Sequence, residues 1–389
     1  MGDKPKILFE LTDEHLETGM RGIPVGYCVT SRVDPIKGLF YIEKPIKELA
    51  CLRPEEVIFL LMQGALGKGP DFDAFCLQLR QRATLDPKVR KHICQFPREA
   101  HPMKLLVAAL AILGGIEGEG RYPEDCLNII AKIPEVIATI INYHAGWGET
   151  PESRPELGYI ENFCYMLNVP TLKDKKTFTE IMKLYNILHY DHGGGNLSVF
   201  VGKAVASGLE DMYGSVAAAM CALAGPRHGK ANQDSLEFVK DIYQIVGDNP
   251  SEQDVEKAVR DRLEQKELIF GFGHAVLRAE DARATIFYEA AKKYYPNHPL
   301  VKVGLLLRTE APKVLKENPK ITNPYPNVDA MSGALLCAAG FDYPEYFTTL
   351  FGLSRVVGIA RQIVYERLEA REGKGTPIVR PKYIYKPQR

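Results

Sequence analysis

The stretch "YGSVAAAMCALAGPRHGKANQD", Tyr213 to Asp234, joins a run of small, uncharged residues to one ionisable imidazole, His228. The run is typical of a buried helix, and the glycines on both sides of His228 let a backbone or a ligand come close to the ring. A helix end also exposes unpaired N–H groups, which hold anions or change the protonation of an imidazole. A functional and a structural role are therefore equally open for His228.

Two further histidines stand beside glycines, His274 in "GFGHAVLR" and His192 in "HYDHGGGN". His189 and His192 are three residues apart, so on one continuous helix they would share a face and could bind a metal. The glycines that follow and the lack of neighbouring cysteines make a metal site the weaker interpretation. His101, in "FPREAHPMKLL", is better explained as a residue at the start of a helix.

Helical periodicity dominates the chain after residue 50, and short strands are predicted only before it. The predicted strands are "KILFEL", "GYCVTSRV" and "GLFYI". Predicted helices include "HPMKLLVAALAILGG", which should end at its paired glycines, and "TFTEIMKLYNILHYDH", which carries His189 and His192 to its end. Alternating strand–helix units are missing, so a parallel sheet is not expected. The prediction is a mainly α fold with a small β region near the N-terminus.

Composition and charge exclude several classes of protein. Lys+Arg and Asp+Glu are 49 each, so net charge favours neither nucleic acid nor an anionic membrane as a partner. The longest charge-free run, Met212 to Pro226, is shorter than the ~20 apolar residues that a bilayer crossing needs. A chain of 389 residues is longer than one core usually supports, so two domains are expected.

The eight cysteines are scattered and form no C-x-x-C pair or zinc-type cluster. The first residues, "MGDKPKILFEL", lack the apolar core of a secretory signal and the Arg/Ser-rich character of a transit peptide. Both observations favour reduced thiols in a cytosol-like compartment. We therefore predict a cytoplasmic protein.

Arginines and one aspartate are the remaining candidates for a site. Arginine binds carboxylates and phosphates because its guanidinium is planar and always charged. Arg278, Arg283 and Arg380 taken singly are better explained as solvated or ion-paired residues, but Arg355 lies in the apolar "GLSRVVG" and needs an anionic partner. In "NPYPNVDAMSGALL", Asp329 is either a helix N-cap or a general base whose pKa apolar neighbours raise.

Five motifs in this order and spacing resemble the citrate synthase family from about Phe96 to Arg380. They are "DHGGGN", "LAGPRHGKANQ", "GFGHAVLRAEDAR", "PNVDAMSGALL" and "LFGLSRVVGIARQI". The resemblance implies a helical homodimer with active sites shared between subunits. It also implies a large domain of residues 1–226 and 339–389, a small domain of residues 227–338, and an active site in the cleft between them.

The reaction that the resemblance implies is the condensation of acetyl-CoA with oxaloacetate and water, without a cofactor or a metal. Asp329 would remove the methyl proton, His228 would hydrogen-bond the thioester oxygen, and His274 would polarise the ketone and protonate the alkoxide. The residues implied for oxaloacetate are His192, Arg283, Arg355 and the partner subunit's Arg380. Those implied for coenzyme A are Arg278, Gly271, Asn327, Lys320 and Arg227.

The chain departs from the family pattern at Gly193, Arg227, Ala282 and Thr322, where relatives often carry Glu, an apolar residue, Pro and Lys. None of these departures removes a proposed catalytic group, but they leave the choice of acyl-CoA open. A 2-methylcitrate synthase acting on propionyl-CoA is one alternative, since one methylene is worth only ~1–3 kcal/mol of discrimination. An inactive relative that binds coenzyme A or a dicarboxylate is another.

Overall fold

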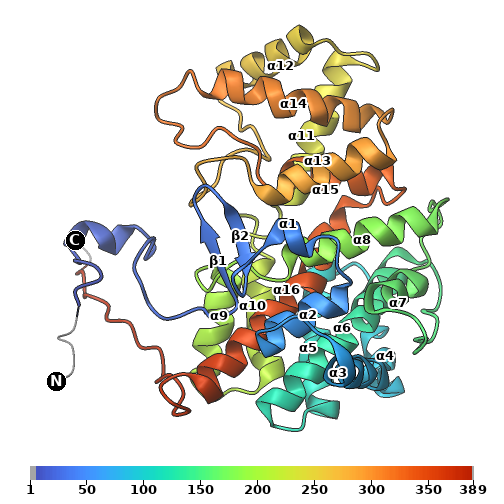
Figure 1. The fold of residues 1–389 in the computed structure, drawn as a ribbon, viewed down its shortest axis with the longest axis vertical. Helices are drawn as coiled ribbons and strands as arrows, with labels where there is room; N and C mark the ends of the chain where they lie inside the picture. Colours follow the sequence, from blue (N-terminus) through green and yellow to red (C-terminus); the bar gives the residue numbers. More distant parts are fainter. Residues whose placement is uncertain (1–5, 388–389) are drawn as a thin grey trace.

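Helices form most of the molecule and pack in two groups along its long axis (Figure 1). The computed structural model describes residues 6–387, so residues 1–5 and 388–389 of the predicted large domain lie outside the described residues. The helices before His228 are α1 (Ile46–Leu49), α2 (Pro54–Gln63), α3 (Gly69–Arg82), α4 (Pro87–Ile93), α5 (Pro102–Glu117), α6 (Tyr122–Ala145), α7 (Tyr159–Met166), α8 (Lys175–His189), α9 (Leu197–Ala206) and α10 (Met212–Leu223). Those after it are α11 (Ala231–Val246), α12 (Glu252–Glu264), α13 (Ala282–Tyr294), α14 (Pro299–Leu315), α15 (Asp329–Ala338) and α16 (Phe347–Val364). Helices α11 to α15 lie together at the top of Figure 1, and α16 returns into the lower group.

A small antiparallel sheet lies near the N-terminus. Its strands are β1 (Ser31–Asp34), β2 (Gly38–Tyr41) and β3 (Lys44–Pro45). Strand β2 falls within the predicted "GLFYI", and β1 overlaps only the end of the predicted "GYCVTSRV". The third predicted strand, "KILFEL", is wrong. That segment is irregular and exposed, because no neighbouring strand among the described residues supplies the backbone hydrogen bonds that a strand needs. The prediction of a mainly α fold with a small N-terminal β region is confirmed.

The interior of the lower group is built around α6 and α16, which pack against each other. Among residues 6–387, only α6 is long and apolar enough to cross a membrane, with a mean hydropathy of 1.3 in its most apolar window. However, 89% of that window is buried inside the protein. Helix α6 is therefore a core helix.

Helix α10, the predicted buried run of small residues, packs against α5 and α9. A Cβ atom on Gly114 of α5 would lie 2.6 Å from the Cβ atom of Tyr213, so only glycine fits there. The prediction that α5 ends at its paired glycines is wrong, because Gly114 serves this close helix contact. The helix continues to Glu117 and ends at Gly118.

Candidate active site

The ends of several helices bring predicted site residues together where the two helix groups meet. His192 follows α8, His274 precedes α13, and Arg283 lies in the first turn of α13. The ring centroids of His192 and His274 are 5.3 Å apart. Nη2 of Arg283 lies 3.1 Å from Nε2 of His192. Residues 82 and 91 positions apart in the sequence therefore share one site.

The imidazole of His274 is held in a defined tautomer. Its Nδ1 atom accepts hydrogen bonds from the backbone N–H groups of Val276 and Leu277, both at 3.0 Å. Nδ1 is therefore unprotonated in the neutral ring, and Nε2 carries the hydrogen. Burial and the charge of Arg283 lower the pKa of His274. His274 is thus a neutral hydrogen-bond donor at neutral pH, as its predicted role requires.

His228 lies in the turn after α10 and is also neutral. Burial, and then the charge of Arg355, lower its pKa to about 4. Its Nε2 atom lies 2.9 Å from Oγ of Ser198 and accepts from the Ser198 backbone N–H at 3.3 Å, which leaves the hydrogen on Nδ1. The neighbouring Arg227 is exposed, so the cation that keeps His228 neutral is Arg355.

Asp329 has the environment of a general base. Burial raises its pKa to about 6, although Arg283 opposes this shift. Asp329 is the first residue of α15, whereas Val328 is the N-cap and no side-chain cap bond is formed. The alternative that Asp329 is a helix cap is therefore wrong. We call His228, His274 and Asp329 the acid–base cluster.

Two buried arginines face this cluster in different states. The guanidinium of Arg283 is paired with Asp281 through Nε and Nη2, the shortest contact being 2.7 Å. Nε of Arg355 donates to the carbonyl oxygen of His189 at 2.8 Å, but its Nη1 is buried without a hydrogen-bond partner among the described residues. Burial lowers the pKa of Arg355 to about 10. An unpaired buried guanidinium N–H is costly unless an anion binds it.

The residues implied for coenzyme A are not gathered in the same way. Arg227, Arg278 and Lys320 are exposed, and the Arg278 guanidinium turns back to the carbonyl oxygen of Leu277 at 2.8 Å. The departure at Thr322 is exposed as well. Gly271 is buried with a φ of 80°, and a Cβ atom there would lie 2.7 Å from the Cα atom of Ala330. Asn327 uses its amide for bonds inside the protein.

Arg380 lies in an exposed C-terminal tail that leaves the body of the protein (Figure 1). The backbone N–H of Val379 donates to Oγ of Ser207 at 2.9 Å and holds the start of this tail at the end of α9. Beyond that bond, the tail exposes large apolar side chains, including Tyr383 at 91%. We call Arg227, Arg278, Lys320 and Arg380 the cationic rim.

Helix α8 ends at His189, so His189 and His192 do not lie on one continuous helix, as the alternative of a histidine metal pair assumed. His189 is fully buried, its ring stacks on Tyr185, and Nδ1 bonds the Tyr185 carbonyl oxygen at 2.8 Å. Among residues 6–387, no group of three or more His, Cys, Asp or Glu residues is placed to hold a metal. His101 caps α5 by accepting from the Met103 N–H, so its structural interpretation is confirmed.

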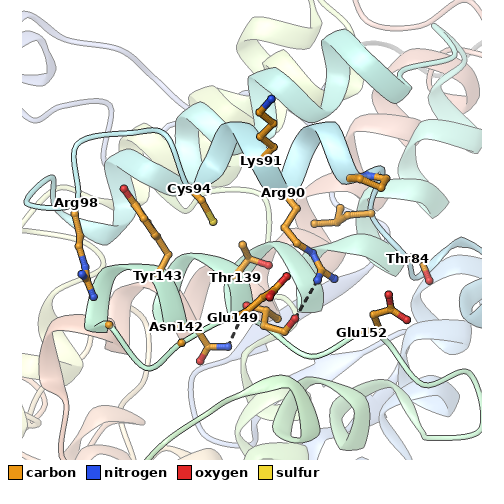
Figure 2. A pocket seen from close by; sticks show the side chains of 15 residues that line it. Thr84, Arg90, Lys91, Cys94, Arg98, Thr139, Asn142, Tyr143, Glu149 and Glu152 are labelled. Atoms are coloured by element: carbon orange, nitrogen blue, oxygen red, sulfur yellow. Dashed lines mark hydrogen bonds between the residues drawn. The ribbon is translucent and has the colours of Figure 1, made fainter.

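A cavity of about 840 Å³ lies away from the acid–base cluster, between α4, the end of α6 and the loop 146–152 (Figure 2). Its walls carry Arg90 and Arg98 but also Glu149 and Glu152, so they have no dominant charge. Dashed lines in Figure 2 show that Arg90 and Asn142 bond to Thr150 of the loop. None of the residues that line this cavity is a predicted site residue.

Sequence reasoning missed two groups that orient the predicted residues. Asp281 is the buried partner of Arg283, and its only signal was an acidic residue two positions before an arginine. Ser198 bonds His228 from the start of α9, and nothing in the sequence connects the two.

Gly193, one of the departures from the family pattern, has a φ of 79°. Its backbone N–H donates a hydrogen bond to the hydroxyl group of Ser31 in β1.

Comparison with known proteins identifies the family of this chain's relatives. A family model described as "Citrate synthase, C-terminal domain" matches residues 19–382. The chain is 34% identical to the mitochondrial citrate synthase of Daucus carota, over 97% of this chain and 83% of that protein. It is 35% identical to the mitochondrial citrate synthase of Citrus maxima, over 94% of this chain and 81% of that protein.

Solved structures agree with these sequence matches. The citrate synthase of Pyrobaculum aerophilum has a TM-score of 0.83 at 27% identity and covers 99% of this chain and 96% of its own. A citrate synthase from Thermoplasma acidophilum, solved with carboxymethyl coenzyme A and oxaloacetate, has a TM-score of 0.81 at 24% identity, over 96% of this chain and 97% of its own. This last match supports the fold alone.

The predicted cytoplasmic location is wrong. The curated relatives are named as mitochondrial enzymes, which points to a mitochondrial rather than a cytoplasmic location. Scattered cysteines indicate a reducing environment but do not specify which compartment provides it.

Proposed function

The chain belongs to the citrate synthase family, and we propose that its acid–base cluster condenses acetyl-CoA with oxaloacetate to citrate, the entry step of the tricarboxylic acid cycle. The observation that carries this proposal is Asp329, a carboxyl group with a pKa of about 6 near two buried arginines. A base with a pKa near the working pH is efficient at proton removal. As an acyltransferase of this kind, the enzyme would need no resident cofactor.

The chemistry requires a base and two hydrogen-bond donors. The Asp329 carboxylate takes a proton from the methyl group of acetyl-CoA while His228 donates to the thioester oxygen. The enol carbon attacks the ketone of oxaloacetate, and the alkoxide takes a proton from Nε2 of His274. Water then cleaves the thioester to give citrate and coenzyme A. The neutral state of both histidines supports these donor roles.

Binding of the dicarboxylate is assigned to His192, Arg283 and Arg355. Two buried guanidinium groups form a site for a dianion, and the unpaired Nη1 of Arg355 supplies a free donor. We assign the exposed Arg227, Arg278 and Lys320, together with Gly271 and Asn327, to the coenzyme A side. Exposed cations suit the phosphates of coenzyme A.

We further propose a closing motion and a homodimer. Residues 227–338 would form a small domain that closes on the large domain of residues 1–226 and 339–389, excluding water from the thioester. The partner subunit's Arg380 would complete the dicarboxylate site. The exposed apolar side chains on the tail support a second copy as its neighbour, because such side chains are usually covered.

The test is a thiol-release assay with oxaloacetate and either acetyl-CoA or propionyl-CoA, in which the product is identified by mass spectrometry. We expect citrate, and a higher kcat/KM for acetyl-CoA, since the relatives are named citrate synthases. A higher kcat/KM for propionyl-CoA would indicate a 2-methylcitrate synthase. Binding of both substrates without thiol release would indicate an inactive relative.

A further inference from the structure

Two asparagine side chains form hydrogen bonds to the loop of His274, one before and one after the imidazole. The Nδ2 group of Asn327 donates to the carbonyl oxygen of Gly273 at 3.0 Å, immediately before His274. The Nδ2 group of Asn323 donates to the carbonyl oxygen of Leu277 at 2.8 Å, three residues after it. The two side chains therefore hold the loop on either side of the imidazole.

The carbonyl end of each asparagine fixes its own segment. Oδ1 of Asn323 accepts from the N–H of Tyr325 at 2.9 Å, and Oδ1 of Asn327 accepts from the N–H of Asp329, also at 2.9 Å. Each side chain thus accepts a hydrogen bond from the N–H two residues onward in its own segment and donates one to a carbonyl oxygen of the His274 loop. Asn327 therefore links the backbone N–H of Asp329, the proposed base, to the backbone carbonyl group beside His274, the proposed acid.

The backbone supports this arrangement mainly before His274. Gly273 N–H donates to the Tyr325 carbonyl oxygen at 3.0 Å, and Asn327 N–H donates to that of Gly271 at 2.9 Å. After His274, the hydrogen bond from Asn323 holds Leu277, whose N–H in turn donates to Nδ1 of His274. Asn323 therefore supports one of the two donors that fix the His274 tautomer.

We propose that Asn323 and Asn327 are positioning residues that hold the His274 imidazole in its Nε2–H tautomer and at a fixed position relative to Asp329. This inference rests on the proposed function, since it assigns both asparagines to the alignment of the acid with the base. Asn323 belongs to none of the residue sets assigned above. For Asn327, alignment is a role additional to contact with coenzyme A. Misplacement of a reacting group by about 1 Å costs on the order of 10²-fold in rate.

The experiment compares Asn323→Ser, Asn327→Ser and the two alanine variants with the full-length wild type. A serine hydroxyl still accepts from the N–H two residues onward but is too short to reach the His274 loop. We expect kcat for citrate formation to fall by about 10- to 100-fold in each variant. The KM of both substrates should change far less in the Asn323 variants, whereas the Asn327 variants should also raise the KM of acetyl-CoA. The serine variants preserve the turn and so remain informative if an alanine variant does not fold.

A second measurement does not depend on turnover. Nitrogen-15 NMR of the labelled His274 ring should report an unprotonated Nδ1 in the wild type and mixed tautomers in the variants. The matched control is Asn142→Ala, which removes a buried asparagine that donates to the Met166 carbonyl oxygen at 2.8 Å and accepts from the Asn168 N–H at 3.0 Å. The control should lower Tm without changing the His274 spectrum or kcat.

Unchanged kcat and unchanged His274 nitrogen shifts in all four variants would overturn the proposal. An increase confined to the KM of acetyl-CoA would also overturn it and would leave Asn327 as a coenzyme A contact only. If the wild type forms no citrate, the proposed function fails, while the NMR spectra still decide whether the asparagines fix the tautomer.

Discussion

The acid–base cluster and the cationic rim differ in how far a single chain assembles them. His228, His274 and Asp329 are half-buried, and hydrogen bonds within the chain orient both histidine rings. The rim residues are exposed, and Arg380 extends away from the body on a tail. The difference indicates that hydrogen bonds within one chain preorganise the reacting histidines, whereas no such bonds fix the rim side chains over a shared site.

The strongest test of the acid–base cluster is Asp329→Asn. We expect the variant to fold and kcat to fall by on the order of 10²- to 10⁴-fold, because the amide cannot accept the methyl proton. Steady-state kinetics and a melting curve on the same sample measure both properties. Near-normal turnover would show that the base lies elsewhere.

Subunit complementation tests the rim at Arg380. Arg380→Ala should nearly abolish activity, since loss of one partner of a buried charge pair costs ~2–5 kcal/mol. His274→Ala should do the same, because it removes the proposed acid. Co-refolding equal amounts of the two variants should restore roughly a quarter of all sites, because half of the dimers then contain one intact site. Two differently tagged chains confirm the heterodimers. No recovery would place both groups in one chain's site or exclude the dimer.

The pH dependence sharpens the contrast, because desolvation raises the pKa of Asp329 in the acid–base cluster to about 6. Activity should rise with pH through about 6 as Asp329 ionises. The folded pKa lies above the unfolded value of about 3.9, so the contribution of Asp329 to stability is greatest below about pH 4 and is lost as pH rises through about 6. Asp329→Asn should therefore have a higher Tm than the wild type at neutral pH, and the gain should vanish in acid. Equal Tm values at neutral pH would argue against a buried, ionised carboxylate.

The smallest effect is expected from Arg278→Ala. An exposed ion pair is worth about 0.2–1 kcal/mol, so the KM for acetyl-CoA should rise by about 2- to 5-fold and the KM for oxaloacetate should stay constant. Added salt should reduce the difference from the wild type.

Arg227→Leu is the control for the electrostatic environment of His228. It should leave the pH–rate profile unchanged, since Arg355 rather than Arg227 lowers the pKa of His228.

Periodicity and motif order predicted the helical fold, because repeated apolar residues determine which face of a helix is buried. The same reasoning was wrong about the "KILFEL" strand and about the end of α5. A strand needs a neighbour that is distant in sequence, and Gly114 is retained for contact with Tyr213 rather than for ending a helix. Both errors come from contacts between segments that the local pattern does not contain.

The candidate residues of the site were also present in the sequence, but their chemical states were not. That His274 and Asp329 are candidates follows from residue type and spacing alone. The tautomer of His274 depends on its N–H donors, and the pKa of Asp329 near 6 depends on burial at the start of α15. The sequence by itself determined which groups are available for acid–base chemistry. The tertiary structure decided their protonation and direction, because burial and the positions of neighbouring charges exist only once distant segments have packed together.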